Sequence, residues 1–448
     1  MDIKKLTPLF EGKRCVILGF GREGKVWLDL LTKLSCCKEI AVADMNPVEI
    51  DNPDIVTHCG EHYLEECENY DLILQSPGVV IKNNLSAAAK AKILTQTEVL
   101  LRLGKDGCLK HIIGITGTKG KSTASSLVYH FLQSCNIPSI LIGNIGIPPL
   151  QRIEEFDENL TVVCEMSCHQ LEFVKHSPDI SVLLNIYPEH LDHYTDLNAY
   201  AQTKRNIARY QTSGCHTLAN IDILPIECGG TLCTTAFGKS ADVWTDGSSL
   251  FLFGKEIPCE CVKTKLCGKH NLYNIAVALA AANFAGADIN TCLEHLCEFE
   301  GLKHRLERIN NIDGVEYIND SISTIPEAAI AAVKAFDDTD CIILGGMDRG
   351  ISYDILGDFL NTGVVKNVIL LPDSGLRIGK LITNPEVSLY YAKDLKDAVL
   401  HSIGCARHRV LFSPASASYG FYKNFEERGD HFKKIVSGYR GFYERMTM

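Results

Sequence analysis

The chain has 448 residues, of which 46% are hydrophobic and 22% are charged. These fractions are typical of a soluble folded protein and exclude a disordered chain, a collagen or a heptad fibre. The formal net charge of −11 argues against nucleic acid or an anionic membrane surface as the main partner, because both repel a negative protein. At about 150 residues per domain, the length predicts three domains.

The 19 cysteines are the unusual part of the composition. They form no CxxC pair and no zinc-finger spacing, and no apolar signal core precedes Cys15. We therefore expect buried, reduced thiols in a cytoplasmic protein. No apolar run reaches the length that a membrane span requires, so we expect no membrane contact.

Short apolar runs alternate with helical patterns along most of the chain. Continuous Val, Ile and Leu runs between helices are typical of parallel sheets that are covered on both faces. The runs fall into three groups, which predicts an α/β fold with three mainly parallel sheets. The predicted strands cover 15–20, 40–44 and 71–78; then 111–117, 139–143, 161–167 and 180–186; and finally 315–320, 341–346, 365–371 and 409–415.

Two polar stretches, 103–110 and 299–307, separate these groups. Residues 214–268 differ from the rest because they contain short hairpin-like pieces, which predict a small antiparallel appendage to the central domain. The predicted domains are a Rossmann-like domain over 1–105, a central phosphate-loop domain over 106–301 and a second Rossmann-like domain over 302–448.

A first glycine loop, CVILGFGREGK, follows the first predicted strand and opens a helix. Gly19, Gly21 and Gly24 have the GxGxxG spacing, and Asp44 ends the next strand, where an acid can bind a ribose. The pattern predicts a site for a nucleotide diphosphate. NAD, FAD and a UDP-sugar remain open as ligands, as does a tight turn that binds nothing.

A second glycine loop, GITGTKGKST, lies between a strand and a helix at 114–123. Ile115 stands where the strict phosphate-loop pattern has glycine, but the two glycines still free the backbone to wrap a phosphate. The lysine can reach the β- and γ-phosphates, and the hydroxyls after it can bind Mg²⁺. The pattern therefore predicts an ATP or GTP site at Gly117, Thr118, Lys119, Gly120, Lys121, Ser122 and Thr123.

Glu165 closes the strand 161–165. A carboxylate there can complete the shell of the metal ion, directly or through water. On its own it would more simply cap the following turn, but its place after a phosphate loop favours the metal.

From GTKGKST onward the sequence resembles the Mur ligases, the ATP-dependent enzymes that build the peptide stem of peptidoglycan. The motifs that carry this resemblance are GNIGIP, EMSCHQLE, NIYPEHLDHY, YAQTKRNI, GKHNLYN, GLKHRLE, INDSIST, LGGMDRG and SPASASYGFYKNFEERG. The resemblance implies that ATP phosphorylates a substrate carboxylate and that an amine then attacks the acyl phosphate. The ending resembles the members that add D-glutamate to UDP-N-acetylmuramoyl-L-alanine, which also implies a monomer.

The resemblance assigns roles to individual residues. It implies catalytic roles for Lys121, Glu165, His190 and Lys204, with Lys204 carbamylated by CO₂. It implies two Mg²⁺ ions near Ser122, Thr123, Glu165, His190 and the carbamylated Lys204. By composition alone, Lys204 would be a solvated helix residue. Further ATP contacts are implied for Asn271, Asn274, Arg305 and Asp320. The UDP-sugar is implied at Gly19, Gly21, Gly24, Asp44, Ser76, Pro77, Gly78 and Asn144. The acceptor is implied at Thr324, Arg349, Ser418, Tyr419 and Phe425.

One motif departs from the family pattern. The family has DSK where this chain has Asp320-Ser321-Ile322, and isoleucine cannot pair with the glutamate carboxylate. Arg349 is the nearest candidate for that task, and L-glutamate remains open as the acceptor. Two functions are alternatives to a ligase. One is an NAD(P)-dependent oxidoreductase, which would leave the second loop unexplained, and the other is a non-catalytic nucleotide-binding switch.

Overall fold

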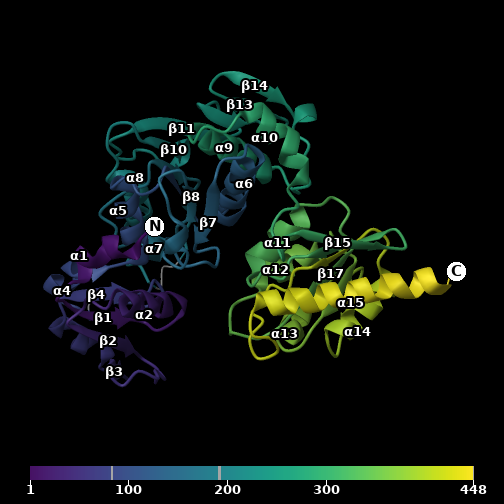
Figure 1. Cartoon of the computed structure of the whole chain (residues 1–448). Coiled ribbons are helices and arrows are strands. Elements are labelled where there is room, and N and C mark those ends of the chain that lie inside the picture. Colours follow the sequence, from purple (N-terminus) through teal and green to yellow (C-terminus); the bar gives the residue numbers. More distant parts are fainter. Residues whose placement is uncertain (82–83, 190–192, 447–448) are drawn as a thin grey trace. The chain divides into compact units, whose positions relative to one another are not determined.

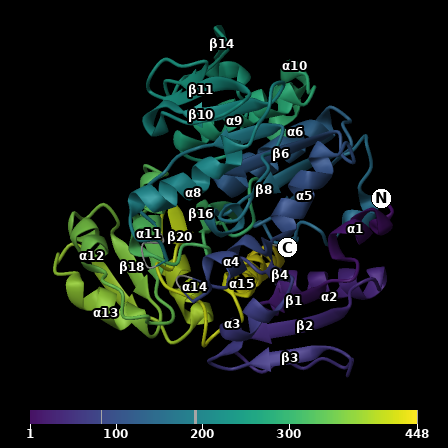
Figure 2. The ribbon, with the colours of Figure 1, turned by 90° about the vertical axis from the view of Figure 1, so that its left-hand side faces the viewer.

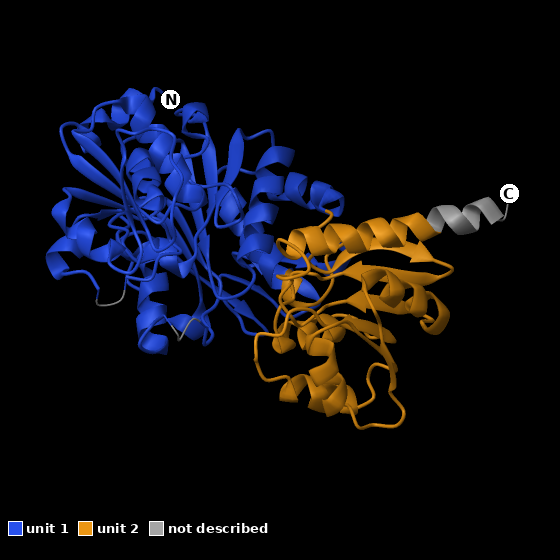
Figure 3. Ribbon diagram, turned by 90° about the horizontal axis from the view of Figure 1, so that it is seen from below, with its two compact units in different colours: residues 1–264, 272–299 blue, residues 265–271, 300–448 orange. Residues whose placement is uncertain are grey.

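The computed structural model describes residues 1–81, 84–189 and 193–446. The chain forms two compact units (Figure 3): residues 1–264 with 272–299, and residues 265–271 with 300–448. The first unit contains two sheets and the second contains one. The predicted α/β fold with three mainly parallel sheets is confirmed, whereas the three predicted domain ranges remain a proposal.

The first sheet is wholly parallel, with the order β3-β2-β1-β4-β5 (Figure 2). Helix α2 follows β1 directly, as the first glycine loop requires. Its strands are β1 (Arg14–Leu18), β2 (Glu39–Asp44), β3 (Val56–Cys59), β4 (Leu72–Gln75) and β5 (Ile93–Leu94). Its helices are α1 (Thr7–Phe10), α2 (Arg22–Leu34), α3 (Tyr63–Glu66), α4 (Ala87–Ala91) and α5 (Gln96–Lys105).

The second sheet has nine strands in the order β14-β13-β12-β11-β10-β9-β6-β8-β7. They are β6 (His111–Thr116), β7 (Ser139–Gly143), β8 (Thr161–Glu165), β9 (Ile180–Leu183), β10 (His216–Asn220), β11 (Thr231–Phe237), β12 (Val243–Thr245), β13 (Ser249–Leu252) and β14 (Lys255–Pro258). The helices are α6 (Lys121–Ser134), α7 (Cys168–Leu171), α8 (Leu197–Arg209), α9 (His270–Phe284) and α10 (Ile289–His295).

The stretch 214–268 does not form a separate appendage. The pairs β9–β10, β10–β11 and β11–β12 are parallel, and only the pairs β12–β13 and β13–β14 are antiparallel. The antiparallel pieces therefore extend the central sheet at one edge. Their short hairpins were visible in the sequence, but their continuity with the parallel strands was not.

The third sheet has the order β15-β16-β20-β17-β18-β19, in which only β15 runs antiparallel. Figure 1 labels its strands β15 and β17 and the helices α11 to α15 that accompany it. Its strands are β15 (Glu307–Ile312), β16 (Val315–Asn319), β17 (Cys341–Leu344), β18 (Asn367–Leu370), β19 (Ser388–Tyr391) and β20 (Arg409–Phe412). Its helices are α11 (Pro326–Lys334), α12 (Asp354–Asn361), α13 (Ser374–Leu381), α14 (Leu395–Cys405) and α15 (Phe425–Met446).

Strand β17 shows why the core strands read as continuous apolar runs. Ile342 and Leu344 pack into the cluster that contains α11, α12 and α13. Cys341 and Ile343 point to the other face and pack into the cluster that contains α14 and α15. Both faces of the strand are therefore buried, so every position along it is apolar.

The glycine loop of the first sheet is supported by a packed core beneath α2. Trp27 is fully buried and lies edge-on to Phe10, with ring centroids 5.9 Å apart. The same apolar cluster includes Leu100 of α5 and Ile140 of β7, so it joins the first and second sheets. Among the described residues, no helix is long and apolar enough to cross a membrane.

We predict that Trp27→Ala destabilises the chain by about 3–5 kcal/mol, because it removes a fully buried ring and leaves a cavity. Urea unfolding followed by circular dichroism measures the change. Leu376→Ala on α13 is the control, because Leu376 is 57% exposed and its truncation should change stability by less than about 0.5 kcal/mol. Equal destabilisation by the two variants would contradict the packing described above.

Candidate functional site

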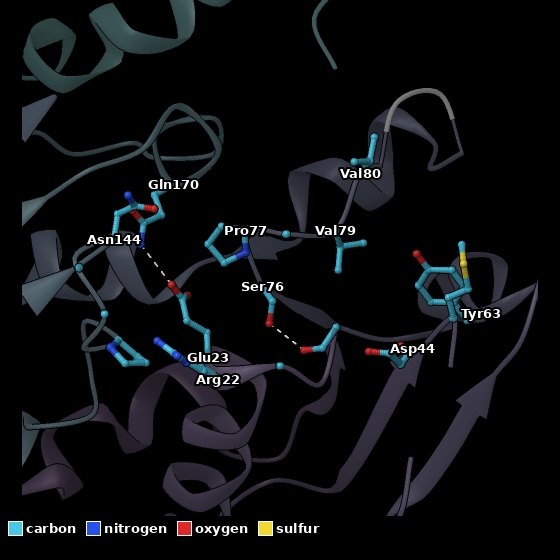
Figure 4. A pocket seen from close by; sticks show the side chains of 17 residues that line it. Arg22, Glu23, Asp44, Tyr63, Ser76, Pro77, Val79, Val80, Asn144 and Gln170 are labelled. Carbon is cyan, nitrogen blue, oxygen red and sulfur yellow. Dashed lines mark hydrogen bonds between the residues drawn. The ribbon is translucent and has the colours of Figure 1, made fainter. Parts of the chain in front are cut away.

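A cavity of about 640 Å³ lies beside the first glycine loop (Figure 4). It is bounded by the loop, the turn after β4 and the loop after β7, all within the first unit. Seven of the eight residues predicted for the UDP-sugar line it. They are Gly19, Gly21, Asp44, Ser76, Pro77, Gly78 and Asn144.

The wall of the cavity depends on a glycine at position 19. Gly19 has φ of 87°, and a Cβ there would lie 2.5 Å from Val79 Cγ2. The Ser76 hydroxyl donates to the Gly19 carbonyl at 2.7 Å, as Figure 4 shows. The Asp44 carboxylate accepts from the backbone N–H of Phe20 at 2.8 Å. These contacts fix the loop with its backbone facing the cavity.

Gly24 does not line the cavity, in contrast to the prediction. A Cβ at this position would lie 2.2 Å from the Gly19 carbonyl oxygen. Gly24 therefore lets α2 pack closely against the loop, which is a structural role for the third glycine of this motif.

Four polar residues of the cavity lining were not predicted from the sequence: Arg22, Glu23, Tyr63 and Gln170. Gln170 donates from Nε2 to Glu23 Oε1 at 3.1 Å, and burial raises the pKa of Glu23 to about 7. Glu23 Oε2 is buried and has no hydrogen-bond partner in the described part of the chain. Glu23 lies at a variable position of the GxGxxG pattern, so the spacing gave no signal for it.

The second glycine loop joins β6 to α6. Gly120 is the N-cap of α6 with φ of 87°, and a Cβ there would lie 2.7 Å from Asn274 Oδ1. Both the conformation and the close approach require glycine. Lys121 Nζ donates to the carbonyls of Gly117 at 2.8 Å and Thr118 at 2.9 Å. The predicted loop residues and Asn274 thus lie together at the start of α6.

Lys204 lies on α8 and is only 1% exposed. Its Nζ donates to the carbonyl of Gly117 at 2.9 Å and lies 4.9 Å from the centre of the Tyr200 ring. Burial, followed by the neighbouring charge of Lys121, lowers the pKa of Lys204 to about 7. The solvated position suggested by composition is therefore wrong, and Lys204 lies against the second glycine loop.

Glu165 ends β8 and is buried. Its Oε1 accepts from Asn144 Nδ2 at 2.7 Å, whereas its Oε2 is buried without a hydrogen-bond partner among the described residues. A buried carboxylate oxygen without a partner is costly unless a cation or a donor binds it. Together with the hydroxyls of Ser122 and Thr123 at the start of α6, it is a donor set that suits Mg²⁺. His190 lies outside the described residues, so its metal role stays a prediction.

In the second unit, Asp320 is buried and stabilises the loop around it through hydrogen bonds. Its carboxylate accepts from Ser323 Oγ at 2.5 Å, Ser413 Oγ at 2.8 Å and the N–H of Leu306 at 3.2 Å. Burial raises the pKa of Asp320 to about 6. Arg305 is exposed. Because Asn271 and these two residues belong to the second unit, their predicted contacts with ATP stay predictions.

The predicted acceptor residues are also in the second unit. Arg349 is exposed and donates to the carbonyl of Thr324 at 3.1 Å. Ser418 is buried, whereas Tyr419 is exposed. The Phe425 carbonyl accepts from Ser321 Oγ at 2.8 Å. The structure thus brings Arg349 to Thr324 and Phe425 to the Asp320-Ser321 turn.

Arg428 is a residue of this region that sequence reasoning did not single out. It is buried and donates to Ser321 Oγ at 3.0 Å, to the Ser321 carbonyl at 2.7 Å and to the Ser416 carbonyl at 2.9 Å. Burial lowers its pKa to about 10. The only sequence signal for Arg428 was its place in the motif NFEERG. Its burial explains the three hydrogen bonds, because a buried guanidinium needs several acceptors.

Comparison with known proteins identifies the family. Residues 115–282 match the model of the Mur ligase middle domain. The UDP-N-acetylmuramoylalanine–D-glutamate ligase of Clostridium kluyveri is 31% identical over 95% of this chain and 96% of its own length. The ligase of the same name from Streptococcus agalactiae is 31% identical over 98% of this chain and 100% of its own.

Solved structures show the same fold. The MurF ligase of Thermotoga maritima in complex with ADP has a TM-score of 0.59 and 17% identity, covering 98% of this chain and 99% of its own. A pseudomurein peptide ligase type C from Methanothermus fervidus has a TM-score of 0.57 and 16% identity, covering 95% of this chain and 100% of its own. With nearly full-length relatives at 31% identity, this chain belongs to the Mur ligase family.

Proposed function

We propose that this chain is an ATP-dependent ligase that joins D-glutamate to UDP-N-acetylmuramoyl-L-alanine in peptidoglycan synthesis, and so serves cell shape and division from the cytoplasm. Relatives that carry this name are similar along nearly the whole chain. The observation that carries the proposal is the hydrogen bond between Asn144 and Glu165. It joins a residue of the cavity to the carboxylate beside the second glycine loop, where the UDP-substrate and ATP must meet.

The residues of the second loop suit the binding of ATP. The free N–H groups at the start of α6 and the amine of Lys121 favour phosphate oxygens. When bound, Mg²⁺ would neutralise charge on the transferred phosphoryl group. Ser122, Thr123 and Glu165 would hold that ion. Such chemistry needs fixed positive groups and accurate positioning more than it needs an enzyme nucleophile.

Lys204 is suited to carbamylation. Only a neutral amine attacks CO₂; the new N–C bond forms and the nitrogen releases a proton to water. Because burial lowers the pKa of Lys204 to about 7, a large part of its amine is neutral at neutral pH. The product is an anion, which relieves the repulsion from Lys121 and supports a second Mg²⁺.

In the second unit, Arg349 is the cation that we assign to the glutamate carboxylate. Ile322 is a partly buried apolar side chain and cannot take this role. A guanidinium grips a carboxylate with two parallel hydrogen bonds, unlike lysine. The oxidoreductase alternative accounts for the first loop only and leaves Lys121, Glu165 and Lys204 without a task.

We predict rapid phosphate release from ATP and UDP-N-acetylmuramoyl-L-alanine with D-glutamate, and little with L-glutamate. Lys121→Ala should lower kcat/KM at least about 100-fold, because it removes a fixed cation from the phosphoryl group. Lys239→Ala is the control, since Lys239 is exposed and pairs with Asp222. Turnover with L-glutamate alone would refute the proposed acceptor, and full activity of Lys121→Ala would refute the phosphate loop.

We predict that ¹³C-bicarbonate gives a carbamate signal in the NMR spectrum of the wild type. The amine is neutral above its pKa, so the signal should be present at pH 8 and decrease as the pH falls through about 7. Lys204→Arg should lack the signal, because arginine stays protonated. A signal of equal size in this variant would assign the carbamate to another amine.

We predict that Arg349→Lys raises the KM for glutamate about tenfold with little change in kcat, because one of two parallel hydrogen bonds is lost. Arg407→Lys is the matched control, since Arg407 is an exposed arginine of the same unit that donates only to backbone carbonyls and lies outside the acceptor residues. Unchanged KM in Arg349→Lys would remove Arg349 from the acceptor site.

A further inference from the structure

Three side chains from the turn after β8 and from the segment before α8 meet without having a role in the proposed reaction. They are His169 on α7, Glu172 directly after it, and His193 in the segment before α8. Their ligand atoms all lie within 4.8 Å of one another. The His169 and His193 rings have centroids 4.5 Å apart, and His193 Nε2 lies 3.3 Å from Glu172 Oε2.

The local structure brings these groups together. His169 and Glu172 are three residues apart on one helical turn, so they share a face. The turn begins with a capping box between Ser167 and Gln170, which fixes its orientation. The His193 side chain is only 9% exposed, and its Nδ1 is buried without a hydrogen-bond partner among the described residues. The Glu172 side chain is 30% exposed and opens the group to solvent.

We propose that His169, Glu172 and His193 bind a divalent transition-metal ion, with Zn²⁺ as the best match. Two imidazoles and one carboxylate form a donor set that suits Zn²⁺, and the fourth position is left for water. Mg²⁺ favours oxygen ligands, so a site with two imidazole nitrogens differs in chemistry from the hydroxyls and carboxylate of Ser122, Thr123 and Glu165. A small closure of the three side chains brings the ligand atoms to the spacing that a tetrahedral ion requires.

The ion would connect two segments that lead to Lys204. The ring of Tyr194, next to His193, lies 4.6 Å from the His193 ring and 5.5 Å from that of Tyr200. Tyr200 in turn lies beneath the Lys204 amine. A bound ion would therefore tie the turn after β8 to the start of α8 and hold this aromatic wall in place, which is a positioning role.

The test is a titration of the metal-stripped full-length protein with Co²⁺, in excess Mg²⁺ and ADP so that the nucleotide site is filled. We expect one equivalent to bind with the visible absorption of a four- or five-coordinate ion, and Zn²⁺ to displace it. His169→Gln and His193→Gln should each abolish this absorption, and Zn²⁺ should raise the Tm of the wild type but not of these two variants. His62→Gln is the matched control, because His62 and Glu65 form an exposed His–Glu pair with the same spacing that belongs to no three-residue ligand group in the described part of the chain.

X-ray absorption of the Zn²⁺-loaded wild type gives a result even if a variant fails to fold. Two imidazoles and oxygen ligands in the first shell support the proposal. Sulfur ligands would place the ion on cysteines and overturn it. Failure of the wild type to bind one equivalent of Co²⁺, or an unchanged spectrum in the His169→Gln/His193→Gln variant, would overturn it as well. None of these readouts depends on ligase activity, so the proposed function is tested separately.

Discussion

The site depends on two amines, one buried and one partly buried, that share one carbonyl. Lys121 and Lys204 both donate to the Gly117 oxygen, and burial lowers the pKa of each. Two cations so close together repel one another and lose their hydration, so the arrangement needs negative charge nearby. The buried carboxylate of Glu165 supplies part of it. A polyphosphate and a carbamate are anions of the kind that would complete the balance, which explains why an acidic chain can still hold anionic substrates locally.

Two neighbouring parallel strands connect Glu165, beside the second glycine loop, to the cavity. Strands β7 and β8 pair in parallel, so their carboxyl ends meet at one edge of the sheet. Gly143 pairs with Glu165 there, and a Cβ on Gly143 would lie 2.2 Å from the Glu165 carbonyl oxygen. The close approach lets the next residue, Asn144, reach the carboxylate while it lines the cavity. Sheet register thus couples the cavity to Glu165 at the end of β8.

Much of the fold and of the cavity could be predicted where a single local sequence pattern was sufficient. Strands buried on both faces, such as β17, read as continuous apolar runs, and Gly19 and Ser76, which the sequence patterns singled out, line the cavity. The edge strand β3 (Val56–Cys59) was missed because it is largely exposed and has no such run. The burial of Lys204 could not be read from its helix, because its partners come from residues far away in the sequence. Only the family resemblance indicated its role.

The second unit shows a different use of a buried cation. Arg428 donates its hydrogen bonds to Ser321 and Ser416, so it cannot also serve as the cation that binds an acceptor. It fixes the turn after β16 against the loop after β20, while Asp320 accepts from Ser413 in that same loop. Both loops leave the carboxyl ends of adjacent parallel strands, where α/β sheets bind ligands. Because the turn is rigid and Ile322 carries no charge, recognition of a carboxylate has to come from a side chain outside it, and this is the physical reason for assigning that role to the exposed guanidinium of Arg349.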